Sequence, residues 1–214
     1  MVFSSTSSQE IALGMSQVKS IIVYGAENAG KCSFVGNLLY SCGAVDMRTL
    51  EQLQQGKLGA EKRGWSAVAE QIRIDREAGK SSGGAFCSPK RKYQILDIQG
   101  HSRFPIASQG HPNLAILVIP ANAESNEKSS WKTLLQECKE HSTEVLIVVT
   151  KVDVGTFSMK IFQHFEGLVT LIAQEVGISV SIVPAHCKGN LVEKCPELSW
   201  WEGHTVLEML DTFS

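Results

Sequence analysis

Apolar runs of strand length alternate along the chain with segments of helical periodicity. Six runs predict strands, at Lys19–Tyr24, Ala85–Ser88, Tyr93–Ile98, Leu114–Ile119, Glu144–Val149 and Ile178–Val183. Segments with helical spacing or composition predict helices at Lys31–Cys42, Glu61–Arg76, 128–141, Phe157–Val176 and Thr205–Leu210. Uninterrupted apolar strands are typical of parallel sheets that are buried on both faces. The order therefore indicates an α/β fold with a mainly parallel, six-stranded sheet and helices on both faces.

The length of the chain and its polar segments indicate one domain behind a flexible lead-in. Residues 1–18 begin with a stretch rich in Ser and Thr, and we expect them to form that lead-in. Residues 19–214 fit one α/β domain with a proper core. Gly43 is placed to cap the first helix, and a loop rich in Gly and Ser at 79–84 follows the second.

Composition argues against nucleic-acid binding, a zinc or disulfide framework, and a membrane span or secretory signal. The net charge is −2, so no basic footprint indicates direct binding to DNA or RNA. The six cysteines are irregularly spaced, which favours reduced thiols in a cytoplasmic protein over a zinc site or a disulfide framework. The longest apolar run, 114–121, is too short to span a membrane, and the N-terminal stretch lacks the basic start of a secretory signal.

The segment between the first strand and the first helix has the composition of a phosphate-binding loop. Residues 25–32 read GAENAGKC, and strand, glycine loop, lysine and helix follow in the order that a P-loop requires. The glycines let backbone N–H groups turn toward an anion, and Lys31 reaches the outer phosphates. A P-loop ends in Ser or Thr, whose hydroxyl binds Mg²⁺, and the thiol of Cys32 is a poor replacement. A plain glycine turn before a core helix is the alternative.

Two further motifs stand at strand ends. Asp97 lies near the end of a predicted strand and is followed by Gly100, which is where a P-loop protein places a second metal-directed carboxylate. Lys151 and Asp153 come directly after the buried strand Glu144–Val149.

With these motifs in this order, the chain resembles a GTPase domain. The residues after the P-loop and the Gly100-His101 pair look like those of eukaryotic elongation factor 1-alpha, whose relatives are the class-II release-factor GTPase and the ribosome-rescue GTPase. The segment 199–208, SWWEGHTVLE, looks like the one that closes the G domain of that family. The resemblance covers about residues 19–213 and implies a P-loop GTPase fold. Two β-barrel domains follow in that family and are absent here, so we expect a fragment or a reduced form.

The resemblance implies a role for each matching residue. The phosphate-wrapping positions are Gly25, Asn28, Ala29, Gly30, Lys31, Cys32 and Ser33. The base-contacting positions are Thr150, Lys151 and Asp153, with Ala185, His186 and Cys187 in the last loop. Lys151 and Asp153 match the guanine-recognition motif of the family, in which the carboxylate accepts both N–H donors of the guanine edge and the Lys stem packs over the base. Asp97 and Ser81 would bind Mg²⁺, and His101 matches the catalytic residue that positions the attacking water. These roles imply GTP or GDP as the bound ligand.

Several positions depart from the family pattern near the metal and the γ-phosphate. Cys32 replaces the hydroxyl residue, and Glu27 stands where the family has a small apolar residue. Glu27 would repel a γ-phosphate unless its carboxylate points to solvent. Residues 98–99 alter the turn that aims His101, which is either a working catalyst or a relic. Ser81 is either a switch residue or part of a loop without that role.

The base-recognition end departs from the pattern at two positions. Thr150 replaces an Asn, which removes an amide that braces the P-loop. The last base-contacting loop of the family has a small residue such as Ser before Ala or Gly, and here it reads Ala185-His186-Cys187. His186 either stacks on the base or fills the loop. His186, Cys187 and Cys195 together fit no common zinc spacing.

Three functions fit these residues. The first is a guanine-nucleotide-binding domain of a translational-GTPase-like protein, with weak or lost GTP hydrolysis and weak or absent Mg²⁺. It would act in translation, ribosome rescue or mRNA surveillance, with ribosomes or RNA-surveillance proteins as partners through domains absent here. The second is an active Mg²⁺-dependent GTPase switch, since Lys31, Asp97 and His101 remain and Ser33 lies one place beyond Cys32. The third is a nucleotide-free pseudo-GTPase, whose fold survives as an interaction scaffold.

Overall fold

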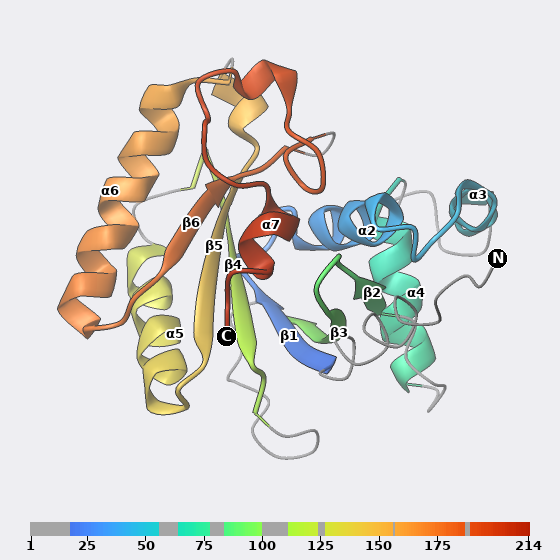
Figure 1. Cartoon of the computed structure of the whole chain (residues 1–214), viewed down its shortest axis with the longest axis horizontal. Helices are drawn as coiled ribbons and strands as arrows, with labels where there is room; N and C mark the ends of the chain where they lie inside the picture. Colours follow the sequence, from blue (N-terminus) through green and yellow to red (C-terminus); the bar gives the residue numbers. More distant parts are fainter. Residues whose placement is uncertain are drawn as a thin grey trace, which may run out of the picture.

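A six-stranded sheet forms the centre of the protein (Figure 1). The computed structural model describes residues 18–55, 64–77, 84–99, 111–123, 127–155, 157–186 and 189–214. Its strands are β1 (Val18–Tyr24), β2 (Ala85–Cys87), β3 (Lys92–Gln99), β4 (Leu114–Pro120), β5 (Glu144–Thr150) and β6 (Ser181–Pro184). They lie in the order β2-β3-β1-β4-β5-β6. Among these strands β2 pairs antiparallel with β3 and the other neighbours pair in parallel, which confirms the predicted sheet.

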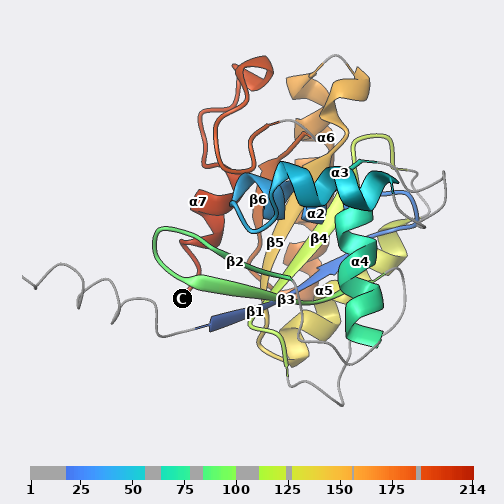
Figure 2. The ribbon, with the colours of Figure 1, turned by 90° about the vertical axis from the view of Figure 1, so that its right-hand side faces the viewer.

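The helices that the structure describes cover both faces of this sheet (Figure 1 and Figure 2). They are α2 (Lys31–Ser41), α3 (Met47–Gln55), α4 (Ser66–Glu77), α5 (Lys128–Glu140), α6 (Met159–Val176) and α7 (Val206–Leu210), with 3-10 turns η2 (Val152–Gly155) and η3 (Pro196–Leu198). Ile21 and Val23 of β1 belong to the core that contains side chains of α2, α4 and α7. Ile22 and Tyr24 belong to the core that contains side chains of α5 and α6. Alternate residues of one buried strand therefore serve two cores.

The last strand begins later than the sequence predicts. The prediction of a strand from Ile178 is wrong, because β6 begins at Ser181. Gly177 ends α6 with a left-handed φ of 73°, and the N–H of Ile178 bonds back to the carbonyl of Ala173 at 3.0 Å. The next residues return the chain from the helix end to the sheet, so they are not available for pairing.

Two predicted helices also begin too early. The helix predicted from Phe157 begins at Met159, because Phe157 has a φ of 53° and its N–H bonds to the carbonyl of Val152 at 3.0 Å. The helix predicted from residue 61 is described from Ser66 onward as α4. The prediction that Gly43 caps α2 is confirmed, since its φ is 71° and its N–H bonds to the carbonyl of Tyr40 at 2.9 Å.

Helix α3 was not predicted from the sequence. Its sequence is mostly polar, and the helical spacing of its three apolar residues, Met47, Leu50 and Leu53, was missed. The structure shows what starts it: a carboxylate oxygen of Asp46 accepts the N–H of Thr49 at 2.7 Å, which is the contact of an N-cap residue. Leu50 is buried in the core and anchors the helix.

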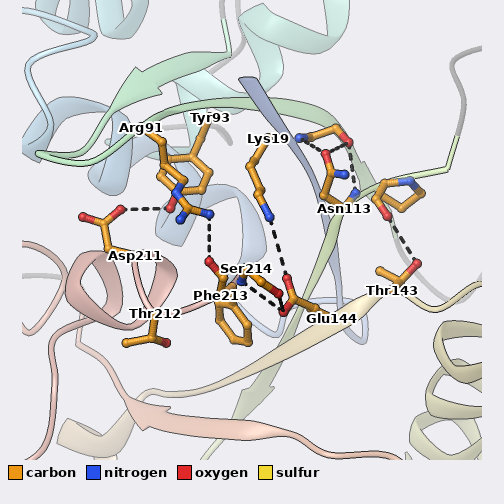
Figure 3. A network of polar contacts seen from close by, with 12 residues as sticks. Lys19, Arg91, Tyr93, Asn113, Thr143, Glu144, Asp211, Thr212, Phe213 and Ser214 are labelled. Atoms are coloured by element: carbon orange, nitrogen blue, oxygen red, sulfur yellow. Dashed lines mark hydrogen bonds and ion pairs between the residues drawn. The ribbon is translucent and has the colours of Figure 1, made fainter. Parts of the chain in front are cut away.

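The last residues are fastened to two distant strands (Figure 3). The buried Asp211 carboxylate accepts hydrogen bonds from Ser88 after β2 and from the Tyr93 hydroxyl of β3. The guanidinium of Arg91 donates to the carbonyl of Phe213 at 2.7 Å. The C-terminus therefore lies beside the β2–β3 hairpin, as Figure 2 also shows.

Candidate functional site

The residues predicted to hold a nucleotide gather at one edge of the sheet. The loop after β1, the end of β3 and the segments after β5 and β6 all follow the carboxyl ends of parallel strands. Strand order reverses at β1, and in open α/β sheets ligands bind in the crevice at such a point. Three predicted site residues, Ser81, His101 and Cys187, lie outside the described residues.

The predicted P-loop has the backbone of an anion-binding turn. Asn28 and Gly30 both have positive φ values, 59° and 95°, and the N–H of Ala29 bonds to the carbonyl of Ala26 at 3.2 Å. A Cβ at Gly25 would lie 2.5 Å from the carbonyl oxygen of Val118, so this position requires glycine. The loop is thus compact and packed directly against β4.

The start of α2 has no side-chain cap. Gly30 is its N-cap and offers no side chain, and the N–H of Phe34 is already bonded to the carbonyl of Gly30 at 2.8 Å. The N–H groups of Lys31, Cys32 and Ser33 come before Phe34, whose N–H makes the first bond of the helical series. A helix start of this kind, following a glycine loop, is a binding site for phosphate.

Lys31 lies under the loop with its ammonium group held by the backbone. Its Nζ donates to the carbonyls of Gly25 at 2.8 Å and Ala26 at 2.5 Å. Burial lowers the pKa of Lys31, and the nearby Cys32, Glu27 and Glu127 act in the opposite direction. A phosphate oxygen would compensate the buried ammonium more strongly than neutral carbonyls do.

Glu27 and Glu127 place negative charge near that lysine. Glu27 is exposed, as the alternative of a solvent-facing side chain requires. Glu127 precedes α5, and its Oε2 is buried without a hydrogen-bond partner among the described residues. Sequence reasoning missed Glu127, because nothing in the local sequence shows that the start of α5 lies near Lys31.

The residues after β5 brace the phosphate loop from the base side. The hydroxyl of Thr150 donates to the carbonyl of Ala29 at 2.9 Å, and Nζ of Lys151 donates to the carbonyl of Asn28 at 2.7 Å. The replacement of Asn by Thr150 was expected to leave the loop without a brace. The structure corrects this expectation. A hydroxyl replaces the amide, and Lys151 adds a second bond.

Two of the residues predicted to contact the base meet across two loops. Asp153 lies in η2, and its Oδ2 is 3.3 Å from Nε2 of His186. The neighbouring Ala185 is buried, and its N–H bonds to the carbonyl of Val149 at 2.9 Å. His186 therefore contacts a residue of the predicted guanine motif, an arrangement that neither sequence alternative included.

The predicted metal corner is small, and a thiol stands beside the one predicted carboxylate ligand. Cys32 and Asp97 line a cavity of about 40 Å³, together with the ion-paired Glu70 and Arg73 of α4. A carboxylate oxygen of Asp97 accepts the N–H of Ile98 at 2.7 Å. Within the described residues, no group of three or more His, Cys, Asp or Glu side chains is arranged to hold a metal ion. The thiol of Cys32 is a poor ligand for Mg²⁺, which prefers hard oxygen ligands such as the Asp97 carboxylate.

Comparison with known proteins agrees with this geometry. Residues 16–213 match the family model of the elongation factor Tu GTP binding domain. The chain is 27% identical over 215 residues to elongation factor 1-alpha of Plasmodium falciparum, covering 90% of this chain and 48% of that protein. It is 30% identical over 221 residues to the eukaryotic peptide chain release factor GTP-binding subunit of Kluyveromyces lactis, covering 90% of this chain and 31% of that protein.

Two solved structures are similar in fold. One is sup35 complexed with GMPPNP, with a TM-score of 0.68 and 20% identity, covering 98% of this chain and 48% of the other. The second is the Ski7 GTPase-like domain of S. cerevisiae bound to GTP, with a TM-score of 0.69 and 18% identity, covering 96% and 51%. At these identities the likeness shows the fold, which is that of a P-loop GTPase.

The chain belongs to the elongation factor Tu GTP-binding domain family. This confirms the family and fold that the motifs predict. The chain spans about half the length of the elongation factors that it matches and about a third of the release factor. Among the described residues, no helix combines the length and apolar character needed to cross a membrane.

Proposed function

We propose that the chain binds a guanine nucleotide, GTP or GDP, and hydrolyses GTP slowly or not at all. The binding proposal rests on the hydrogen bonds that join the segment after β5, where the base is expected, to the loop where the phosphates are expected. Thr150 and Lys151 stand beside the base position and hold the carbonyls of the phosphate loop. Lys31 and the start of α2 would hold the phosphates, and Asp153 would accept the N–H donors of the guanine edge.

Slow hydrolysis follows from the metal corner. Positioning and charge neutralisation carry much of phosphoryl-transfer catalysis, and Mg²⁺ supplies a large share of both. Cys32 offers a thiol where a hydroxyl is needed, and side chains of α4 line the small corner beside it. Losing a metal ligand lowers the rate on the order of 10²–10³-fold. Binding survives, because backbone N–H groups and Lys31 need no metal.

The first experiment is calorimetric titration of the purified chain with GTP, GDP and ATP, each with Mg²⁺ and with EDTA. We expect binding of GTP and GDP, no binding of ATP, and little change in EDTA. Collapse of binding in EDTA would show that Cys32 still permits a metal site. Absence of binding for every nucleotide would contradict the proposal and support the scaffold alternative.

The second experiment places a hydroxyl at position 32, where a P-loop has Ser or Thr. We expect Cys32→Ser to raise Mg²⁺-dependent GTP hydrolysis by about tenfold or more, whereas Cys42→Ser, a half-buried cysteine at the end of α2, leaves the rate unchanged. A fast rate in the unaltered chain that Cys32→Ser does not change would instead support the active switch.

For the cellular role, we infer translation or mRNA surveillance in the cytoplasm. The support is the identity of the relatives, an elongation factor and a release factor subunit. Contacts with ribosomes or RNA-surveillance proteins would involve the parts of such proteins beyond the matched region. Cosedimentation of the longest natural form of the protein with ribosomes, in GTP and in GDP, tests this. A protein that stays at the top of the gradient in both nucleotides contradicts the ribosomal role.

A further inference from the structure

We propose that Arg73 of α4 binds the γ-phosphate of GTP and supplies there the positive charge that a metal ion supplies in other P-loop GTPases. The inference rests on the proposed nucleotide binding and deepens it. It names the side chain that holds the γ-phosphate when no Mg²⁺ is bound. Arg73 lies outside every motif that the sequence analysis identified.

The first observation is where Arg73 lies. The cavity of about 40 Å³ between Cys32, at the start of α2, and Asp97, near the end of β3, is also lined by Glu70 and Arg73. In a P-loop protein the metal ion lies at this junction and bridges oxygens of the β- and γ-phosphates. A charged side chain that lines the junction is therefore next to the γ-phosphate, which GTP has and GDP lacks.

The second observation is the charge of the cavity. Glu70 and Asp97 contribute carboxylates, and among the described residues that line the cavity Arg73 carries the one positive charge. Lys31 lies under the phosphate loop, where two backbone carbonyls accept hydrogen bonds from its Nζ. A γ-phosphate adds negative charge to a cavity that already holds two carboxylates. A γ-phosphate that binds here therefore needs the guanidinium of Arg73 as its counter-ion.

The third observation is how Arg73 is held. Its Nε and Nη2 donate to the two carboxylate oxygens of Glu70, at 3.3 and 2.5 Å. The Glu70 side chain is only 12% exposed, whereas the Arg73 side chain is 55% exposed, so the carboxylate lies inside and the guanidinium nearer to the surface. A guanidinium presents its N–H donors as a fork that matches two oxygens of a phosphate. The edge formed by Nη1 and Nη2 can therefore contact a phosphate while Glu70 holds the edge that contains Nε.

The helix that carries this ion pair is fixed against the core. Ala69 and Ile72 of α4 are buried, and they belong to the core that also contains side chains of α2. Figure 1 and Figure 2 both show α4 beside α2. Because α4 cannot turn without exposing these apolar side chains, Glu70 and Arg73 stay at the cavity. Such preorganisation increases affinity for the ligand that matches it.

The experiment uses two substitutions that break the same ion pair but change the charge of the cavity in opposite directions. Dissociation constants for GDP and for GMPPNP, a GTP analogue that resists hydrolysis, are measured by calorimetry in EDTA. The proteins are the unaltered chain, Arg73→Gln, Glu70→Gln and the control Arg48→Gln. Arg48 is an exposed arginine of the neighbouring helix α3, and it does not line the cavity.

The quantity compared is the ratio of the GDP dissociation constant to the GMPPNP dissociation constant. Arg73→Gln should lower this ratio about tenfold or more, which is the size of a hydrogen-bonded contact between charged groups. Glu70→Gln should raise it about threefold or more, because it removes a negative charge beside the γ-phosphate. Arg48→Gln should leave the ratio unchanged.

The outcomes separate this inference from the proposed function. If the unaltered chain binds neither nucleotide, nucleotide binding itself is wrong and the inference falls with it. An unchanged or raised ratio in Arg73→Gln overturns the inference while nucleotide binding stands. A ratio that falls in both Arg73→Gln and Glu70→Gln also overturns it, because the ion pair would then act only by holding the structure. If Arg73→Gln does not fold, Glu70→Gln decides: a raised ratio supports the role of Arg73, and an unchanged or lowered one contradicts it.

Discussion

At the scale of single residues, Thr150 shows how a substituted motif keeps its mechanical role. Its hydroxyl is buried and donates to the carbonyl of Ala29 at 2.9 Å, and a longer contact of 3.5 Å reaches the carbonyl of Ile119. A buried backbone carbonyl is costly to leave without a donor. The hydroxyl therefore both stabilises the fold and fixes the end of the phosphate loop.

We predict that Thr150→Val lowers the free energy of unfolding by about 1–3 kcal/mol and weakens GDP binding. Valine has nearly the same shape, so the change removes the donor and little else. The control is Thr133→Val, whose exposed hydroxyl donates to the carbonyl of Ser129 at 3.0 Å on α5. Urea denaturation followed by circular dichroism measures both variants. Equal small losses of unfolding free energy in the two variants would show that the buried hydrogen bond to Ala29 stabilises the protein no more than an exposed one does.

Residues of the candidate site were predictable where a single local motif identifies them, and contacts between different loops were not. Lys31 and Asp153 follow from spacing after a strand, and the structure brings both to the same edge of the sheet. The contact between Asp153 and His186 was not predictable, because it depends on two loops that approach each other only after β5 and β6 pair. The hydrogen bond of Thr150 was missed for a similar reason, since it depends on how closely the hydroxyl approaches Ala29.

At the scale of elements, the close packing of α2 against the start of α4 explains why α2 contains Gly36, although glycine has a low helix propensity. Gly36 lies in the middle of α2, where glycine costs about 1 kcal/mol relative to alanine. A Cβ there would lie 1.8 Å from the carbonyl oxygen of Trp65, just before α4. The rings of Tyr40 and Trp65 pack beside this contact, with 4.6 Å between centroids.

We predict that Gly36→Ala destabilises the protein by about 1–3 kcal/mol despite the better helix propensity of alanine, because a backbone carbonyl cannot move aside cheaply. The matched control is Gly167→Ala in α6, where an added Cβ meets nothing within 4 Å. That variant should gain about 0.4–1 kcal/mol. Thermal unfolding of the two variants gives shifts of opposite sign. A gain of stability in both variants would contradict the prediction, because it would mean that α2 and α4 can move apart without loss of stability.

The same scale shows why some elements were predictable and others were not. β4 and β5 are buried on both faces, so apolar runs mark them almost to the residue. β6 has only two fully buried residues, and its apolar run continues into the turn after α6, which shifted the predicted start. Helix α3 buries little beyond Leu50. Asp46 and the spacing of Met47, Leu50 and Leu53 were the sequence signals that could have located it.

At the scale of the whole molecule, the fastening of the C-terminus connects elements that are far apart in sequence. Asp211 follows α7 and accepts bonds from Ser88 and Tyr93 at the β2–β3 hairpin. Ser214 donates to the Glu144 carboxylate at the start of β5, and Lys19 of β1 lies 3.9 Å from that carboxylate (Figure 3). Burial, followed by the bond to Asp211, raises the pKa of Tyr93, so its hydroxyl stays protonated and donates.

We predict from this network that α7 unfolds together with the sheet and not separately. Asp211→Ala removes the acceptor of the buried Tyr93 hydroxyl and leaves Ser88 only the carbonyl of Arg91 at 3.2 Å, so it should lower the free energy of unfolding by about 3 kcal/mol. Asp211→Asn keeps an acceptor oxygen and should lose less, about 1 kcal/mol. The surface ion pair of Lys132 and Glu175, at 2.8 Å, provides the control: Glu175→Ala should cost no more than about 0.5 kcal/mol.

The measurement follows urea unfolding by two probes at once. Tryptophan fluorescence includes Trp200 and Trp201, which lie shortly before α7, and far-ultraviolet circular dichroism reports the helices and sheet as a whole. If the fastening couples α7 to the sheet, both curves shift together in Asp211→Ala and remain coincident. Two separated transitions, with the dichroism midpoint unchanged, would contradict the coupling, because they would show that the C-terminal segment detaches while the sheet stays folded. Coincident curves that do not shift would show instead that Ser88 and Tyr93 find other acceptors.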